Sequence, residues 1–378
     1  MCAARSFNCW RTSRSRGCEV ARSLGAGSVV DADVAEVLSA DLPWDGLAGS
    51  SVLVTGASGM LPSYACYVLL GLNDLLGTGI TVHGLVRNEA KARRILGPLL
   101  DRPDFRLIVA DVATFTDGST AFDHVVHGAS AARPALHAAD PVATIKANLL
   151  GTLNLLDLCV AGGARSFSLM SSAEVYGAQP EGTTLIAEDS YGGFDILNPR
   201  ACYSEGKRAA ETICAAYAKQ FGIACTIPRF GHIYGPGMAL DDGRVQADFA
   251  AAVIAGRDVT LNSAGLATRT YTYVSDAISG LFHALLKGES ATAYNIADPA
   301  GLVSIRELAR LFVAARPGKG LRLRFSNPAD QSAFAASAAQ GLSSARIEAL
   351  GWRPRVALPE GIDRTLRHHE EAADASVA

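Results

Sequence analysis

A tyrosine and a lysine stand four residues apart in the segment 199–208, PRACYSEGKR, as Tyr203-x-x-x-Lys207. On a helix this spacing places both side chains on one face. A phenol with an ordinary pKa of about 10 is a poor base at neutral pH, but a neighbouring ammonium group favours the phenolate. Roughly 0.16 pairs with this spacing are expected by chance in a chain with this many tyrosines and lysines, so the spacing alone proves little. The alternative is a surface tyrosine beside a solvated lysine. The pair therefore predicts a proton-transfer site if other motifs accompany it.

A glycine turn earlier in the chain is the first accompanying motif. The β-rich run 51–55 ends in Gly56 and Gly59, and apolar residues at helical spacing follow from Tyr64. Gly56 permits a tight turn, and Gly59 lets the backbone approach a pyrophosphate that the helix N-terminus binds. Strand, glycine turn and helix predict a dinucleotide site, although a purely structural turn is the alternative. The contacts expected from this turn come from Gly56, Ser58, Gly59, Met60 and Leu61.

Two residues depart from the usual dinucleotide pattern. Pro62 stands where a third glycine is common, but proline is tolerated in a first helical turn because its missing N–H would have no partner there. Arg87 follows the expected second strand, 80–86, at the place where an acidic residue would hold a ribose 2′-hydroxyl. An arginine here can pair with the 2′-phosphate of NADP or lie along the adenine of NAD. We expect NAD, with NADP as the alternative.

Small and acidic residues follow two more expected strands. Asp111 and Val112 come after the run 105–110 and are expected on the adenine side of the cofactor. Ala129 lies where the run 122–130 enters a loop of small residues. Such a loop leaves room for a bound cofactor, so all three residues are expected to contact it.

The fifth expected strand, 166–171, delivers Ser172 and Glu174 at its carboxyl end, the edge of an open parallel sheet where ligands bind. Five strands alternating with helices up to Tyr203 predict an α/β fold: a Rossmann-type doubly wound parallel sheet with a smaller C-terminal substrate-binding lobe. The helix expected at 141–161 has an apolar face that should point to the core, formed by Val142, Ile145, Leu149, Leu153 and Leu156.

The chain is expected to divide into a tail and two lobes. Residues 1–27 carry five arginines among serines and glycines and are expected to be disordered. An amphipathic helix is expected at 31–42, covering the sheet. The boundaries expected are 28–230, with 270–296 returning to it, for the NAD(P)-binding domain, and 231–269 with 297–368 for the substrate lobe.

Composition excludes several classes of protein. A net charge of −3 argues against a nucleic-acid binder or a protein of anionic membrane surfaces. Eight cysteines occur without metal-ligand spacing, so we expect buried thiols in a reducing compartment and no metal. The sequence has no run of 18 apolar residues and no apolar core of a secretion signal, so we expect a cytoplasmic protein that does not bind membranes.

Taken together, the chain from about 48 to 365 resembles the extended short-chain dehydrogenase/reductases that modify nucleotide sugars. Further motifs join those above, namely Asn148 with Gly151-Thr152, Arg229 through Gly235-Pro236, and Thr268-Arg269 ahead of Tyr273-Val274-Ser275-Asp276. The resemblance implies bound NAD, a nucleotide-sugar substrate and a cofactor contact from Asn148. It also implies a homodimer built from the helix with Leu149 and the helix carrying Tyr203.

Within that family, the segment 199–208 and the run Asp242-Gly243-Arg244-Val245 resemble UDP-glucuronate decarboxylases. This likeness implies that Ser172 and Tyr203 contact the sugar O4, Lys207 holds the nicotinamide ribose and Glu174 faces the sugar ring. It also implies that Arg244 and Arg269 reach the diphosphate or uridine end, since guanidinium groups suit phosphate oxygens.

The expected reaction begins with oxidation at C4, which leaves a ketone β to the C5 carboxylate. Such a β-keto acid can lose carbon dioxide, and the ketone then takes the hydride back. The alternatives are 4,6-dehydration, which would require an aspartic acid where Ala173 stands, and 4-epimerisation, which usually needs no carboxylate at Glu174. A cofactor-sensing scaffold is the non-enzyme alternative, although such proteins tend to lose the tyrosine and lysine.

Two departures from the decarboxylase pattern weaken that assignment. An Arg-Lys-Pro segment that is thought to hold the substrate carboxylate is replaced at about 336–341 by Ala-Ser-Ala-Ala-Gln-Gly. His232 stands where the decarboxylases usually have asparagine, and a role in sugar binding or in structure is expected for it. Either another cation binds the carboxylate, or the substrate is not a uronate.

Overall fold

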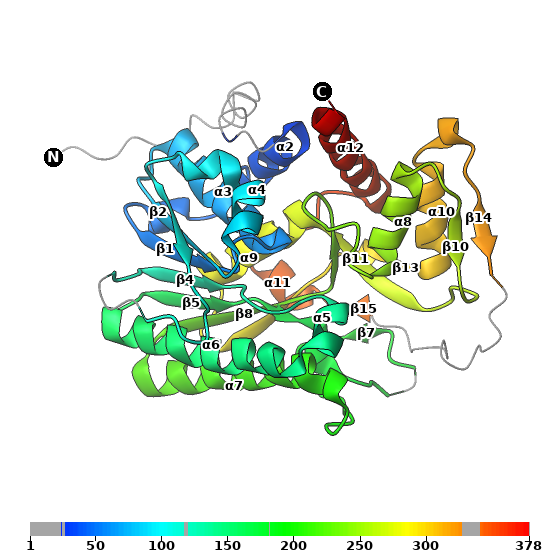
Figure 1. Ribbon diagram of the computed structural model, residues 1–378. Coiled ribbons are helices and arrows are strands. Elements are labelled where there is room, and N and C mark those ends of the chain that lie inside the picture. The colour runs from blue at the N-terminus through cyan, green and yellow to red at the C-terminus, as the bar shows by residue number, and fades with distance from the viewer. Residues whose placement is uncertain (1–23, 25–26, 117–119, 181, 327–340, 378) are drawn as a thin grey trace.

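A computed structural model describes residues 24, 27–116, 120–180, 182–326 and 341–377. The expected tail at 1–27 and the segment that replaces Arg-Lys-Pro therefore lie almost wholly outside the described residues. The described chain forms an α/β domain with a second lobe of helices and short strands at one end (Figure 1).

The central sheet has eight strands and is parallel throughout its pairings, in the order β12-β8-β5-β4-β1-β2-β3 with β6 also paired to β8. The order reverses between β1 and β4, which is the point where such sheets bind ligands. The predicted doubly wound parallel sheet is therefore confirmed. Its strands are β1 (Ser51–Thr55), β2 (Thr81–Val86), β3 (Phe105–Val109), β4 (His124–His127), β5 (Ser166–Leu169), β6 (Ser171–Ser172), β8 (Ala224–Phe230) and β12 (Thr292–Ile296).

Helices cover both faces of the sheet, as Figure 1 shows. One face carries α6 and α7, and the apolar residues between them and the sheet form one core. The other face carries α2, α3, α4 and α9, whose buried residues form a larger core that continues into the second lobe. These helices are α2 (Ser28–Leu38), α3 (Met60–Leu76), α4 (Glu89–Leu100), α6 (Pro141–Gly162), α7 (Cys202–Phe221) and α9 (Val274–Lys287), and the short α5 (Pro134–Ala139) precedes α6.

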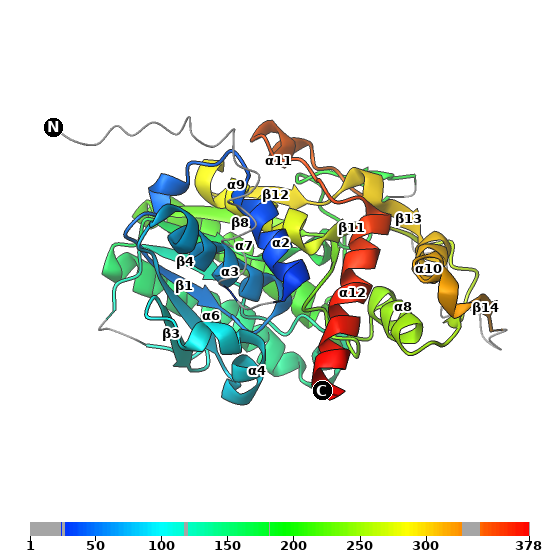
Figure 2. The ribbon, with the colours of Figure 1, turned by 90° about the horizontal axis from the view of Figure 1, so that it is seen from above.

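The second lobe combines helices with small sheets beside the carboxyl edge of the large one. Its strand β11 pairs with β9 and β13, β10 pairs with β14, and β15 pairs with β7. The chain then ends in α12, which packs against α8 and α2 (Figure 2). The elements are β7 (Leu185–Ile186), β9 (His232–Tyr234), α8 (Val245–Ile254), β10 (Val259–Leu261), β11 (Thr268–Tyr273), β13 (Leu302–Ser304), α10 (Ile305–Ala314), β14 (Leu323–Phe325), β15 (Gly341–Leu342), α11 (Ala345–Ala349) and α12 (Leu358–Val377).

Two expectations about helices were wrong. The helix expected at 31–42 begins at Ser28 and ends at Leu38, because the backbone N–H groups of Ser39 and Ala40 bond to the last helical carbonyls and close it. In α6 the expected core face is partly exposed: Val142 and Ile145 are 61% and 39% exposed. The face that packs on the protein instead contains Thr144, Asn148, Gly151, Thr152, Leu155, Leu156 and Cys159.

Helix α6 is apolar along much of its length. By length and composition alone this helix could span a membrane, and a third of its most apolar window is buried in the protein. Here α6 lies along α7, and both helices pack on the sheet. Leu150 and Val160 are also exposed on it, so α6 carries apolar residues on both its inner and outer sides.

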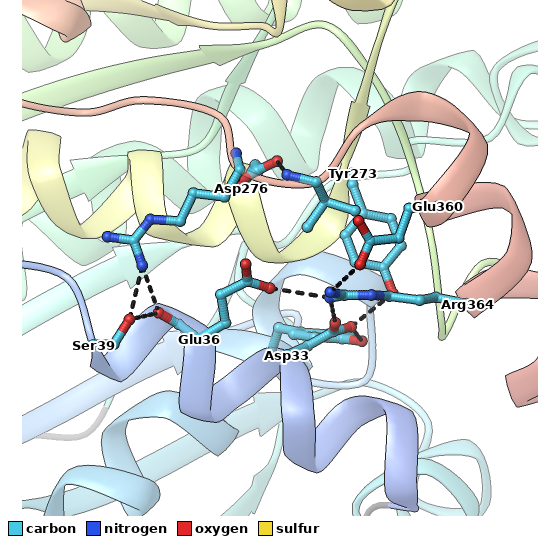
Figure 3. Close-up of polar contacts among 10 residues, drawn as sticks. Asp33, Glu36, Ser39, Tyr273, Asp276, Glu360 and Arg364 are labelled. Atoms are coloured by element: carbon cyan, nitrogen blue, oxygen red, sulfur yellow. Dashed lines mark hydrogen bonds and ion pairs between the residues drawn. The ribbon is translucent and has the colours of Figure 1, made fainter. Parts of the chain in front are cut away.

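A buried acid joins the N-terminal helix to the C-terminal one (Figure 3). Asp33 of α2 has no exposed surface and accepts hydrogen bonds from the hydroxyl groups of Tyr64 and Tyr273, at 2.9 and 2.8 Å. Arg364 of α12 donates to Asp33 at 2.9 Å and also bonds Glu36 and Glu360. Burial raises the pKa of Asp33 to about 6, against the lowering effect of these partners. The guanidinium therefore offsets much of the cost of burying this carboxylate.

We predict that Arg364→Met lowers the free energy of unfolding by about 3 kcal/mol at pH 7, because it leaves an uncompensated buried carboxylate. The loss should be smaller at pH 5. The penalty of an acid with a raised folded-state pKa grows from its unfolded-state pKa near 4 up to its folded-state pKa, so a variant that raises the pKa of Asp33 further differs from the parent chiefly above about pH 6. Asp33→Asn added to Arg364→Met should recover part of the loss. Denaturant unfolding at both pH values measures these effects, with Arg367→Gln, an exposed position on the same helix, as the control. Equal losses at pH 5 and pH 7 would contradict the prediction.

Candidate functional site

A cavity of about 710 Å³ lies at the carboxyl edge of the sheet, between the sheet and the second lobe. Its walls include the loops after β1, β2 and β4, the first turn of α7 and the segment that leads into α8. The cavity therefore crosses the reversal point of the strand order, between β1 and β4. Tyr203, Lys207, Ser172 and Glu174 all line it.

The glycine turn forms one wall and fits a dinucleotide. Gly56 has a φ of +69°, and a Cβ on it would lie 2.9 Å from the backbone of Ala129, so no other residue fits. Gly59 precedes the first residue of α3, Met60, whose helix N-terminus faces the cavity and favours phosphate. Pro62 is accommodated because Gly128 opposite it has no side chain: a Cβ there would lie 2.6 Å from the proline ring.

Arg87, Asp111 and Val112, which we expected from the sequence to lie near the adenine of the cofactor, also line the cavity. Arg87 lies 3.9 Å from Asp111 in an ion pair, and both side chains are about half exposed. Such a pair leaves the guanidinium fixed near the end of β2 without burying it. Asn148 does not reach this cavity. Its side-chain amide donates to the Thr144 carbonyl at 3.0 Å, and it packs against Gly206 of α7.

Tyr203 lies in the first turn of α7 and is buried. Its hydroxyl group hydrogen-bonds with Ser172, and the ring of His137 stacks on it at a centroid distance of 4.4 Å and an angle of 11°. Burial, with a smaller contribution from Glu174, raises the pKa of Tyr203 to about 12, although Ser172 and Arg244 lower it. A positive charge beside the phenol would lower that pKa further, which is what a base for an alcohol requires.

Lys207 is one helical turn further along α7, with its ammonium group 6.0 Å from the centre of the Tyr203 ring. Its Nζ donates to the Met170 carbonyl at 2.7 Å, and burial lowers its pKa to about 8. Glu211, on the same helix, opposes that shift. The lysine thus supplies a buried charge that is easily lost, close to the tyrosine that needs it.

Ser172 is the last residue of β6 and caps the short 3₁₀ turn Ala173–Tyr176, which contains Glu174. The Ser172 hydroxyl oxygen accepts a hydrogen bond from the backbone N–H of Glu174 at 3.2 Å, which fixes the turn. Ser204 donates to the Glu174 carboxylate at 3.3 Å. Ala173 between them carries no proton donor. The turn therefore presents one hydroxyl and one carboxylate to the cavity beside Tyr203.

Arg244 and His232, which we expected from the sequence to contact the substrate, both line the cavity. Arg244 bonds Asp242 at 3.2 Å and donates to the Ala132 carbonyl across the cavity mouth. Burial, Arg269 and Arg244 lower the pKa of His232 to about 3, so this ring is neutral at physiological pH. Arg269 does not line the cavity in this state; its guanidinium donates to the Thr268 carbonyl at 2.7 Å.

Several cavity residues were not identified from the sequence. His137 comes from the short helix α5, and its ring bonds the Ala131 carbonyl. Arg133 and Asp241 meet across the mouth at 3.4 Å. Gln246, His368 and His369 come from α8 and α12. No motif in the sequence indicated that these polar residues would face the cavity.

A doubly wound sheet whose glycine turn, tyrosine and lysine share one cavity defines a nicotinamide-dinucleotide enzyme of the α/β class. The NAD dependent epimerase/dehydratase family matches residues 52–297, about two thirds of the chain. The chain belongs to this family, and the resemblance seen in the sequence is confirmed.

Similar proteins span most of the chain. UDP-glucuronic acid decarboxylase 1 of Xenopus tropicalis is 34% identical over 84% of this chain and 71% of its own length. UDP-glucuronic acid decarboxylase 6 of Arabidopsis thaliana is 32% identical over 82% of this chain and 86% of its own. Among solved structures, the UDP-glucose 4-epimerase of Thermus thermophilus in complex with NAD is 28% identical, with a TM-score of 0.68, over 85% of this chain and 99% of its own.

A further structure supports the fold alone. The UDP-glucuronic acid 4-epimerase of Bacillus cereus, in complex with UDP-glucuronic acid and NAD, has a TM-score of 0.71 at 24% identity and covers 85% of this chain and 99% of its own.

The cofactor of the family is NAD, and the glycine turn and the α3 N-terminus have the geometry to hold it.

We predict that Lys207→Met stabilises the protein at pH 7 while abolishing turnover. A buried lysine whose folded-state pKa is lowered from 10.5 to about 8 destabilises the fold while it is protonated, by roughly 3 kcal/mol before its hydrogen bond is counted. That penalty falls as pH rises from about 8 to 10.5. Denaturant unfolding of the cofactor-free chain should therefore show a gain of about 2 kcal/mol at pH 7 that shrinks by pH 10. A gain independent of pH would exclude this cause.

Proposed function

We propose that this protein is a UDP-glucuronate decarboxylase that forms a UDP-pentose through a transient 4-keto sugar. The observation that carries the proposal is the turn Ser172-Ala173-Glu174 beside Tyr203, in one cavity with the NAD-binding glycine turn. The decarboxylase names of the relatives support it.

The side chains divide the reaction between them. NAD, held at the glycine turn and the α3 N-terminus, would supply the hydride acceptor and donor for sugar C4. Tyr203, hydrogen-bonded to Ser172, accepts the O4 proton, and Ser172 keeps O4 in line with the phenol. Lys207 places a positive charge 6.0 Å from the centre of the Tyr203 ring. The resulting ketone is β to the C5 carboxylate, which then leaves as carbon dioxide, and Glu174 is placed to exchange a proton with C5.

The uronate carboxylate needs a cationic partner, because a carboxylate that enters a buried site without one loses its hydration with little in return. Arg244 is the candidate. Its guanidinium lines the cavity and lies close enough to Tyr203 to lower the pKa of that phenol. Arg244 bonds the Asp242 carboxylate at 3.2 Å and the Ala132 carbonyl, and the second of these is a neutral partner that a substrate carboxylate can replace.

The alternative reactions differ in what they need from the same turn. A 4,6-dehydratase must protonate a leaving C6 hydroxyl, and Ala173 has no proton to give. A 4-epimerase needs the ketone to turn over in the site, and stacking of His137 on Tyr203 narrows the space in which it would turn. Both reactions remain measurable outcomes of the test below.

With UDP-glucuronate as substrate, we predict release of carbon dioxide and a UDP-pentose, identified by mass spectrometry. Tyr203→Phe should lower the rate at least a thousandfold, because no group then accepts the O4 proton. Glu174→Gln should lower the rate of decarboxylation more than it weakens binding. Glu205→Gln, outside the cavity on the same helix, is the matched control. Inert UDP-glucuronate together with conversion of a neutral hexose nucleotide would refute decarboxylation.

We further propose a homodimer through α6 and α7. The support is the row of exposed apolar side chains on the outer side of this helix pair, including Val142, Ile145, Leu150 and Phe221. Exposed apolar side chains that lie close together are typical of an interface, and a two-fold axis would pair the two helices with those of a second copy.

We also propose a cytoplasmic location. The free thiols of Cys66, Cys159, Cys202, Cys214 and Cys225 support it, because thiols stay reduced there.

A Leu150→Asp, Ile145→Asp double variant should dissociate the dimer at micromolar concentration, because two carboxylates in an apolar interface lose hydration without a partner. Light scattering measures the mass. Leu266→Asp, an exposed leucine of the second lobe, is the control and should leave the mass unchanged. A wild-type monomer at the same concentration would exclude the proposed dimer.

A further inference from the structure

One wall of the cavity contains polar atoms without hydrogen-bond partners. Gln246, in the first turn of α8, is 1% exposed, and neither its side-chain oxygen nor its nitrogen has a partner. Oδ1 of Asp242 and Nε2 of His369 also have no hydrogen-bond partner. All three side chains line the large cavity, where α8 packs against α12.

Buried polar atoms without partners lower the stability of the fold unless another group forms hydrogen bonds with them. A buried polar group left without a partner costs about 1–3 kcal/mol, and most such groups in folded proteins have one. Four unpartnered atoms on three neighbouring elements of a single wall therefore indicate a ligand that brings donors and acceptors with it.

The polar atoms themselves specify the kind of ligand. Gln246 offers one donor and one acceptor, and the Asp242 carboxylate offers an acceptor. Burial and the adjacent His368 lower the pKa of His369 to about 4, so its ring is neutral and forms ordinary hydrogen bonds. A bare phosphate would be repelled by Asp242, and a purely apolar group would satisfy none of these atoms. Hydroxyl groups next to phosphate oxygens match all of them.

The position of this wall agrees with that chemistry. A Cβ on Gly237, which precedes the cluster, would lie 3.5 Å from Met60 at the start of α3. His369 also faces the Met238 carbonyl, which keeps its ring beside this loop. The cluster thus shares the cavity with the helix N-terminus that attracts phosphate. Arg364, one helical turn before His368, fixes α12 through Asp33 and holds the wall in place (Figure 3).

We propose that Gln246, Asp242 and His369 form a subsite for a ribosyl diphosphate, with ribose hydroxyls bonded to Asp242, Gln246 and Nε2 of His369 and diphosphate oxygens accepting from the Gln246 amide. Two molecules carry this group. One is NAD, the cofactor of the family, and the other is the nucleotide-sugar substrate, whose assignment to this subsite rests on the proposed function.

Isothermal titration of the full-length chain, stripped of bound nucleotide, tests the subsite with NAD, ADP-ribose and UDP. Gln246→Met and His369→Phe keep side-chain volume but remove the hydrogen-bonding atoms. Each variant should bind either NAD and ADP-ribose or UDP at least tenfold more weakly than the parent chain does. A loss confined to NAD and ADP-ribose assigns the subsite to the cofactor, and a loss confined to UDP assigns it to the substrate. Asp248→Asn on α8 and Arg367→Gln on α12 are exposed controls that should change neither affinity.

Unchanged affinity for all three ligands in both variants, with a raised unfolding temperature, would overturn the proposal, because the wall would then be satisfied by water alone. If one variant does not fold, the other still decides. The result is separable from the proposed reaction: a chain that forms no pentose nucleotide from UDP-glucuronate but loses affinity for NAD in Gln246→Met has the subsite without the decarboxylase activity.

Discussion

The site depends on a buried ion pair beneath it. Arg229 of β8 bonds Glu211 of α7 through two nitrogens, the shortest contact being 2.6 Å, and also donates to the Tyr176 hydroxyl and the Glu188 carbonyl. Ser171, next to Ser172, donates to the same glutamate. One pair thus connects the helix of Tyr203 and Lys207 to the turn of Ser172 and Glu174. Removing either charge would leave the other buried without a partner and release both halves of the site.

The same arrangement sets the electrostatics of the reacting groups. Glu211 is the main influence that opposes the loss of charge on Lys207, and Lys207 in turn lies below Tyr203. The pKa of the phenol is raised by burial, which makes it a strong base once ionised but a rarely ionised one. Arg244 already lowers the pKa of this phenol, and the positive charge of an oxidised nicotinamide would lower it further, which would couple proton abstraction to the oxidised cofactor.

The parts that sequence reasoning found are those with local signals. The glycine turn, the strands and the Tyr203-Lys207 spacing follow from short-range rules, and the sheet edge brings them together by topology. Asn148 and Arg269 carry family motifs, yet in this state one packs between helices and the other bonds its neighbouring carbonyl. His137 and His369 could not be found, because no periodicity shows which side of a polar helix faces a cavity formed by distant segments. The apolar pattern of α6 was misread for a related reason, because a hydrophobic stripe does not show whether it packs on the core of the chain or stays exposed on its surface.

The placement of α12 also bears on how the chain matures during synthesis. The glycine turn and Tyr203 leave the ribosome well before Leu358–Val377, which supplies Arg364 to Asp33 and two histidines to the cavity wall. Until that helix arrives, Asp33 has two tyrosine hydroxyls and no cation, and the cavity is open on one side. Domains generally fold as units, N-terminal first. A nascent chain would therefore present a nearly finished nucleotide fold whose closing wall is added last, so stable capture of nucleotide would follow translation of the final helix.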